Sequence, residues 1–222
     1  MDDLPYWPMT NLRLTTPRLE LRFPSNLDLA ALATVAVGGI HDPAVQPFTA
    51  EWTDAPPAQV ALSTMQYQWG TWANWKPNDW GLSFVTVHSG QIIGTQEIGA
   101  KDFAVLREVH SGSYLGRAFQ GRGFGAEMRA AVLHLAFAGL GAQHATSGAF
   151  EDNQASLGVS RKLGYREDGI QRCVVRGKAS VLRRLRLTRE DWEAHRTAPV
   201  EIHGLEPCLP LLGAGPNHAT LR

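Results

Sequence analysis

The chain has 222 residues, of which 44% are hydrophobic and 19% are charged, so its composition is that of a globular protein and excludes intrinsic disorder. Its 21 Lys and Arg residues balance its 21 Asp and Glu residues, which argues against a nucleic-acid partner, and no apolar run reaches the length of about 20 residues that a membrane span requires. The acidic N-terminus has no apolar signal sequence, and Cys173 and Cys208 form no CxxC motif or Cys/His cluster, so we expect a reduced, cytoplasmic protein without a metal.

The first half of the chain combines strand and helix patterns with an irregular stretch. Leu19, Leu21 and Phe23 alternate with charged residues, which is the pattern of a half-buried strand. Ser89-Gly90 is a dipeptide typical of a hairpin turn. The expected elements are an arm (1–14), a strand (17–23), a helix (26–37), an irregular stretch rich in Pro and Trp (41–77) with a helix near 57–72, and a hairpin of two strands (81–100).

The second half contains the helix with the clearest apolar face. Met128, Ala131, Val132 and Leu135 recur at helical spacing within 124–138. The other expected elements are a strand (107–115), a strand (144–150), a short helix (151–164), two strands near 165–168 and 179–187, and a helical turn (187–196). This order predicts an α/β or α+β layered fold, with one domain over 15–198 and a C-terminal tail over 199–222.

A glycine-rich loop precedes that helix, with the sequence Gln120-Gly-Arg-Gly-Phe-Gly-Ala126. A helix N-terminus presents unpaired N–H groups and the positive end of a dipole, glycines allow close approach of the backbone, and Arg122 adds a cation. The loop therefore predicts phosphate or pyrophosphate binding, and a tight turn that only begins the helix is the alternative. A P-loop is excluded because no Lys-Ser/Thr follows, and a dinucleotide-binding fold fits poorly because no strand ends directly before Gly121.

Four stretches, in order, resemble the GNAT superfamily of N-acetyltransferases, and in particular its Rim-type branch of ribosomal-protein N-terminal acetyltransferases. Residues 120–125 resemble the Q/R-x-x-G-x-G/A loop of that family, and the others are TTPRLELR (15–22), NQASLGVSRKLGYRE (153–167) and RLTREDW (186–192). The resemblance covers nearly the whole chain. It implies the GNAT fold, in which helices flank a central, mixed, mostly antiparallel sheet and strands 4 and 5 splay apart to hold coenzyme A.

The resemblance also implies where coenzyme A binds. The pyrophosphate is expected on the glycine loop and the pantetheine arm beside 113–115, with Asn153 bonding the arm, capping the next helix, or doing both. The residues implied in binding are Ser113, Tyr114, Leu115, Gln120, Gly121, Arg122, Gly123, Phe124, Gly125, Ala126, Asn153 and Ser156.

The implied chemistry is attack of a primary amine on the thioester, which needs a base, donors for the oxyanion and a donor for the leaving thiolate. Many family members have a tyrosine acid seven residues after the motif asparagine, where this chain has Ser160. The Rim-type branch has a serine three residues after the asparagine, so Ser156 is the expected thiol-side donor, and a hydroxyl that bonds back to the helix cap is the alternative. Glu97, Glu108 and His110 on the central strands are the candidate bases, and none is preferred.

The expected co-substrate is acetyl-CoA or succinyl-CoA, and the expected acceptor is a small-molecule amine or the amine of a protein or peptide. A succinyl carboxylate would need cations, for which His110, Lys101 and Arg107 are close enough in sequence. The Trp-rich stretch 69–80 lies where this branch builds part of the acceptor wall, and packing in the core or a dimer contact explains it equally. A non-catalytic acyl-CoA-binding module or sensor is the alternative function, and a homo-oligomer is expected.

Overall fold

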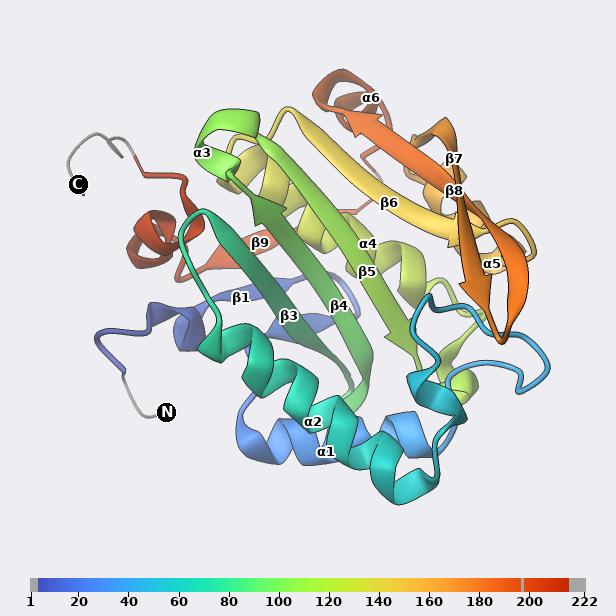
Figure 1. The fold of residues 1–222 in the computed structure, drawn as a ribbon. Helices are drawn as coiled ribbons and strands as arrows, with labels where there is room; N and C mark the ends of the chain where they lie inside the picture. Colours follow the sequence, from blue (N-terminus) through green and yellow to red (C-terminus); the bar gives the residue numbers. More distant parts are fainter. Residues whose placement is uncertain (1–3, 197, 216–222) are drawn as a thin grey trace.

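An open nine-stranded sheet runs through the residues that the computed structural model describes, 4–196 and 198–215 (Figure 1). The strand order is β7-β8-β6-β5-β4-β3-β2-β1-β9. The strands are β1 Arg13–Thr15, β2 Glu20–Arg22, β3 Asp79–His88, β4 Gln91–Lys101, β5 Glu108–Leu115, β6 His144–Phe150, β7 Arg166–Val175, β8 Lys178–Thr188 and β9 Glu201–His203. The helices are α1 Asn26–Val37, α2 Pro57–Ala73, α3 Phe103–Leu106, α4 Phe124–His134, α5 Gln154–Lys162 and α6 Arg189–Ala194.

Strands β5 and β6 form the parallel pair of the sheet, and the other neighbours are antiparallel. They are paired only at Glu108–His110 of β5 and His144–Thr146 of β6. Beyond these positions the two strands diverge (Figure 1). The mixed, mostly antiparallel sheet with a splayed central pair confirms the predicted fold class.

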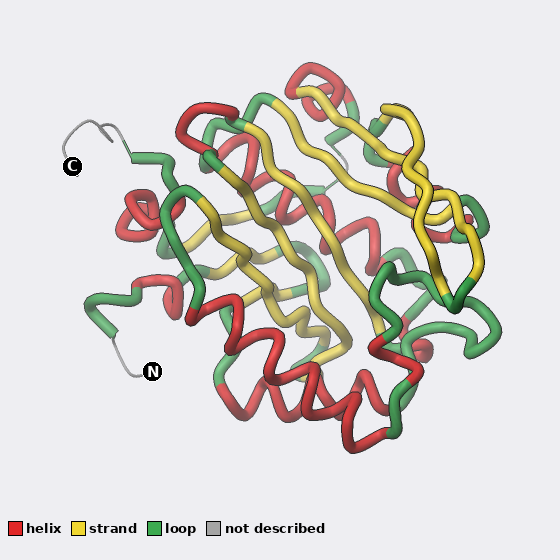
Figure 2. Tube along the Cα trace, viewed as in Figure 1, coloured by secondary structure: helices red, strands yellow, loops and turns green. Residues whose placement is uncertain are grey.

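The central strands are buried on both faces because different helices cover them (Figure 2). Leu82 and Phe84 of β3 belong to the main core, together with Met128 of α4. Val85 of the same strand packs in a second cluster with Leu32 of α1. Since successive strand residues point to opposite faces, α1 and α2 lie on one side of the sheet and α4 on the other.

Several expected elements are found at or near their predicted bounds. Helix α1 covers 26–37 as predicted, and Ser25 begins it with a capping box to Asp28. The hairpin turn falls at Ser89-Gly90, where both residues have positive φ angles of 49° and 78°, as a two-residue turn between strands requires. The helix predicted over 124–138 is an α-helix only to His134, and a π-helical turn continues it over Leu135–Gly139.

The structure adds elements that the sequence patterns did not indicate. Helix α3 stands between β4 and β5, and β7 continues to Val175, well beyond the predicted 165–168. Strand β9 lies in the segment assigned to the tail and pairs with β1. Met9 in the arm and Leu212 in the tail are fully buried. Both segments therefore contribute to the core of the domain. Residues 1–3 and 216–222 of these segments lie outside the described part of the chain.

In the part of the chain that the structure describes, no helix combines the length and the apolar character needed to cross a membrane.

Candidate active site

The glycine loop joins the end of β5 to α4 and presents an uncapped helix N-terminus. Gly121 and Gly123 have φ angles of 71° and 82°, which side chains rarely adopt, so these positions depend on glycine. Gly123 is the N-cap of α4, and no side chain bonds to the first amides of the helix. The exposed N–H groups and the helix dipole therefore remain available to an anion.

An acidic residue in the first turn of α4 is neutralised from another part of the chain. Glu127 is buried and accepts hydrogen bonds from Nε of Arg18 at 2.6 Å and from Oγ1 of Thr16 at 2.7 Å. The Arg18 guanidinium also lies 4.7 Å from the centre of the Phe124 ring and donates to the carbonyl of Arg122 at 3.1 Å. The ion pair with Arg18 consequently cancels most of the negative potential that Glu127 would add to the anion site.

Arg18 is a site residue that sequence reasoning missed. It lies 109 positions before Glu127, and nothing in its local pattern marks it as more than a strand-end cation. The side chain of Gln120, a residue predicted to bind coenzyme A, donates its amide N–H groups to the carbonyls of Ile40 and Leu115 at 2.7 and 2.8 Å. The Gln120 side chain thus fixes the shape of the loop. Its backbone stays part of the loop predicted to bind the pyrophosphate.

The divergence of β5 from β6 opens a wedge at the end of the glycine loop. Ser113 and Tyr114 of β5 lie beyond the last pair with β6, and the N-terminus of α5 begins on the other side. The side chain of Asn153 accepts from the backbone N–H of Ser156 at 3.1 Å, so Asn153 caps α5 as one of its two interpretations predicted. This cap involves the backbone N–H of Ser156 and not its hydroxyl.

Two of the candidate bases come together on the face of the sheet that α1 and α2 cover. Oε2 of Glu97 accepts from the hydroxyls of Tyr67 at 2.6 Å and Ser83 at 2.9 Å. Nε2 of His110, on the next strand, lies 3.8 Å from Oε1 of Glu97. Burial alone would raise the pKa of Glu97, but His110 and the two hydroxyls outweigh it and hold that pKa below its ordinary value. Burial, with Glu97 beside it, raises the pKa of Tyr67, so this phenol stays a neutral donor.

The third candidate base is engaged elsewhere. Glu108 pairs with Arg186 of β8 and does not contact the Glu97–His110 pair. Of the cations considered for a succinyl carboxylate, only His110 lies at the cluster. Arg107 stacks on Phe103 and donates to the carbonyl of Leu140, toward the opposite end of α4.

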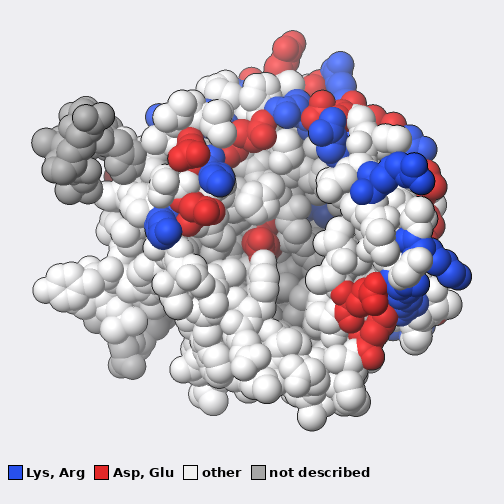
Figure 3. Space-filling view, viewed as in Figure 1, with Lys and Arg blue, Asp and Glu red and all other residues white. Residues whose placement is uncertain are grey.

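A groove of about 400 Å³ between α2 and β3 leads toward the Glu97 cluster. Tyr67, whose hydroxyl contacts Glu97, is one of its lining residues. The complete lining is Gln66, Tyr67, Gly70, Thr71, Asn74, Asp79, Trp80 and Gly81. Figure 3 shows this face of the molecule hollowed near its centre, with charged side chains to the left of the hollow, above it and to its right.

Most of the tryptophans around the groove pack in the core. Trp75 and Trp80 stack with ring centres 5.9 Å apart, and Trp72 lies 4.8 Å from Phe23. Trp69 donates to the side chain of Asn26 in α1. Packing is therefore the main role of the Trp-rich stretch, and only Trp80 also lines the groove.

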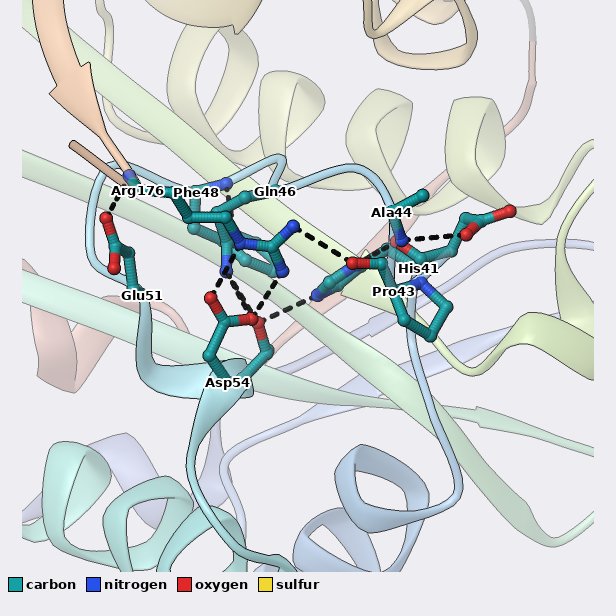
Figure 4. A network of polar contacts seen from close by, with 10 residues as sticks. His41, Pro43, Ala44, Gln46, Phe48, Glu51, Asp54 and Arg176 are labelled. Atoms are coloured by element: carbon teal, nitrogen blue, oxygen red, sulfur yellow. Dashed lines mark hydrogen bonds and ion pairs between the residues drawn. The ribbon is translucent and has the colours of Figure 1, made fainter. Parts of the chain in front are cut away.

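A strap, residues 41–54 of the loop between α1 and α2, crosses the opening between β5 and the β7–β8 hairpin. Arg176, in the turn between β7 and β8, donates to both carboxylate oxygens of Asp54 at 2.6 and 2.7 Å and to the carbonyl of Pro43 at 2.9 Å (Figure 4). At its other side, Trp52 lies 5.7 Å from the ring of Tyr114 on β5. The strap thus connects β5 with the turn between β7 and β8.

Comparison with known proteins identifies the architecture. The family model described as an acetyltransferase (GNAT) domain matches residues 18–166, more than half of the chain. The chain belongs to the GNAT family. The sequence-based resemblance is confirmed, and so is the presence of an acyltransferase domain.

Solved structures of Rim-type GNAT proteins share the fold at low sequence identity. RimJ of Mycobacterium smegmatis, in complex with a coenzyme A disulfide, is 18% identical with a TM-score of 0.67, over 91% of this chain and 95% of RimJ. The ribosomal-protein-S5-alanine acetyltransferase of Vibrio fischeri is 17% identical with a TM-score of 0.63, over 81% and 98%. RimL, the ribosomal L7/L12 α-N-protein acetyltransferase in complex with coenzyme A, is 16% identical with a TM-score of 0.63, over 78% and 95%.

Proposed function

We propose that this GNAT protein is an N-acetyltransferase that moves the acetyl group of acetyl-CoA to a primary amine by direct attack. The observation that carries the proposal is the continuity of three features: an uncapped glycine-rich helix N-terminus, a wedge between β5 and β6, and a carboxylate–imidazole pair beside the wedge. Membership of the acetyltransferase family and the coenzyme A complexes of RimJ and RimL support it.

The donor site follows from the backbone of the loop and the wedge. The N–H groups of residues 121–126 receive the pyrophosphate, Arg122 beside the Phe124 ring adds positive charge, and Arg18 neutralises Glu127. The pantetheine arm then lies along residues 113–115 of β5, whose backbone has no partner on β6. Its amides pair with this edge much as a strand would.

The amine approaches from the face that carries Glu97 and His110. Because the pKa of Glu97 is held low, the carboxylate is ionised and attracts the ammonium form of the acceptor. We assign His110 as the group that takes the ammonium proton, with Glu97 orienting the ring, since imidazole is the side chain most often used as a general base. The amine nitrogen then attacks the thioester carbon, and Ser156 donates on the thiol side.

The acyl group is assigned as acetyl and not succinyl. A succinyl carboxylate placed near His110 would also lie near the ionised carboxylate of Glu97, which repels it. Arg107 is turned toward Phe103 and Leu140 and does not offset this repulsion.

The acceptor is assigned as the N-terminal amine of a protein or peptide. The groove between α2 and β3 has amide and carboxylate side chains, from Gln66, Asn74 and Asp79, that match the hydrogen-bonding groups of a peptide backbone. The named substrates of the Vibrio fischeri enzyme and of RimL are ribosomal proteins, which supports a protein acceptor.

Calorimetric titration with coenzyme A, acetyl-CoA and succinyl-CoA, followed by turnover with a panel of peptides and small amines, tests the proposal. We expect micromolar binding of the donors, turnover of acetyl-CoA with peptide amines, and a loss of about 100-fold in kcat for His110→Ala. Donor binding without turnover of any amine would favour a coenzyme A sensor. Absence of donor binding would remove the function and leave the fold unchanged.

A further inference from the structure

A buried arginine lies behind the wedge without a carboxylate partner. Arg129 of α4 has a relative exposure of only 5%, and in the described residues no Asp or Glu oxygen lies within ion-pair distance of it. Its Nη1 donates to Oγ of Ser160 at 2.9 Å, its Nη2 lies 3.5 Å from Oγ of Ser113, and its Nε has no partner. Burying an unpaired charge is costly, so an anion that enters the wedge is the expected counter-charge.

The surroundings of the guanidinium are polar but uncharged. Ser111 and Ser113 of β5 pair with Ile98 and Gln96 and therefore face α4, whereas Gly112 between them pairs with Glu97 on the other face. The titratable group facing Arg129 is Tyr165, whose pKa is raised by burial, so its phenol stays neutral. The protein supplies hydroxyls and one positive charge here, and leaves the negative charge to a ligand.

Strands β5 and β6 separate after His110 and Thr146. A ligand in the wedge between them can therefore contact groups from both faces of the sheet. A thioester held in the wedge has the Glu97–His110 pair on one side and the Arg129–Ser160 pair on the other. If the amine attacks from the side of Glu97 and His110, the sulfur of the leaving group faces Arg129 and Ser160. We propose that Arg129, acting with the Ser160 hydroxyl that it holds, stabilises the negative charge that develops on the sulfur of coenzyme A as it leaves.

This inference rests on the proposed function, in which the acyl group moves from sulfur to nitrogen. The amine nitrogen forms a bond to the thioester carbon, the C–S bond breaks, and its electron pair moves to sulfur. His110 takes the ammonium proton before attack, and the second proton that the nitrogen loses as the amide forms goes to water. Coenzyme A leaves as a thiolate paired with Arg129, which keeps its own proton throughout. Arg129 is therefore a source of fixed charge and not an acid.

The test uses the thiol of bound coenzyme A, which absorbs near 240 nm as a thiolate. A free thiol titrates near pH 8.5, and a neighbouring arginine lowers that value by about one unit or more. Titrating the complex with wild-type protein should give a thiol pKa lowered by this amount, and with Arg129→Met the shift should disappear. Arg129→Lys, which keeps the charge, should restore part of it. Equal thiol pKa values with the wild-type and Arg129→Met proteins would overturn the inference.

Stability separates this role from a purely structural one. Replacing a buried, unpaired charge by an apolar side chain of similar size is neutral or stabilising, so Arg129→Met should keep or raise the Tm while kcat falls about 100-fold. Arg189→Met is the matched control, because Arg189 donates to the carbonyls of Phe137 and Ala142 at the far end of α4. It should lower the Tm and leave the thiol pKa unchanged.

The outcomes distinguish the inference from the proposed function. A lower Tm for Arg129→Met, with an unshifted thiol in the wild-type complex, would show that Arg129 only braces α4 against α5. If coenzyme A did not bind to the wild-type protein at all, the proposed function and the inference would both fail. If it bound and the thiol were not shifted, the inference alone would fail.

Discussion

The imidazole of His110 occupies the space above Gly99, its partner on the neighbouring strand β4. A Cβ atom at position 99 would lie 2.6 Å from both Cε1 and Nε2 of His110 and 2.9 Å from the carbonyl oxygen of Trp80. The ring therefore reaches Glu97 only because residue 99 has no side chain. A glycine in a buried strand, which otherwise weakens it, here makes room for the imidazole that we propose as the base.

Gly99→Ala should consequently displace His110 and lower kcat without affecting donor binding. The added methyl also meets the Trp80 backbone, so we expect a loss of about 1–3 kcal/mol in the free energy of unfolding. Gly112→Ala is the control, because Gly112 lies on the same face of β5 as His110, pairs with Glu97, and a Cβ there meets nothing within 4 Å. Measuring kcat, donor affinity and urea unfolding for both variants checks this. Equal kcat values would contradict the assigned position of the base.

Gly123→Val should abolish tight coenzyme A binding while the domain remains folded. The φ angle of 82° strains any side chain, and a branched one blocks the approach of phosphate to the first amides of α4. Gly141→Val is the matched control, because Gly141 has a similar φ of 76° and open space around it, away from the loop. Both variants should lose about 1–3 kcal/mol of stability through backbone strain, and only Gly123→Val should lose affinity in calorimetry.

The local patterns of the sequence were sufficient for much of the fold. The boundaries of α1 and the turn at Ser89-Gly90 depend on capping and turn chemistry within a few residues, and both were predicted correctly. Strand β9 was not predicted, because three residues, Glu201–His203, carry too little periodicity to be recognised. Its position is determined by pairing with β1 at the other end of the chain, which no local pattern encodes.

The candidate site likewise combines residues that local sequence reveals with residues whose position depends on distant contacts. The glycine loop was recognisable because its residues are consecutive. Glu97, Glu108 and His110 were equivalent as sequence positions, and only strand register separates the pair that meets from the residue that binds Arg186. Arg18 and Arg129 were missed because their roles depend on partners that are distant in the chain, Glu127 and Ser160.

Removing the Arg18 side chain should weaken both donor binding and stability. Arg18→Met leaves the buried Glu127 carboxylate with fewer partners beside the anion site, and we expect a loss of about 1–3 kcal/mol, since Arg18 itself is partly exposed. The double variant Arg18→Met/Glu127→Gln removes the uncompensated charge and should recover part of the stability and of the affinity. Chemical denaturation and calorimetry of the two variants measure this. Absence of any recovery would indicate that Glu127 is not the cause.

Arg176→Ala should release the strap without unfolding the domain. Arg176 is the residue that joins the strap to the β7–β8 turn through Asp54 and Pro43 (Figure 4). We expect faster hydrogen exchange over 41–54 and a higher KM for the acceptor, with the Tm nearly unchanged because the ion pair is at the surface. The control is Arg183→Ala, on strand β8 of the same hairpin, which breaks exposed ion pairs with Glu167 of β7 and with Glu151 after β6. If both variants changed exchange over 41–54 equally, the strap would not depend on Arg176.

The Glu97 carboxylate should make stability depend on pH in a specific direction. Its pKa is lower in the folded protein than in the unfolded chain, so the folded state gains stability that is fully present above the unfolded value of about 4.3 and is lost as pH falls through the folded pKa. The groups that face it are His110 and the hydroxyls of Tyr67 and Ser83. The difference in free energy of unfolding between the wild-type protein and Glu97→Gln should therefore shrink as the pH falls below about 4.3. Tyr67→Phe removes one donor and raises the pKa of Glu97, so its loss of stability should begin at a higher pH than in the wild type. Urea unfolding at a series of pH values from neutral to acid measures all three proteins, and a difference that stays constant throughout would mean that the carboxylate gains nothing from its neighbours.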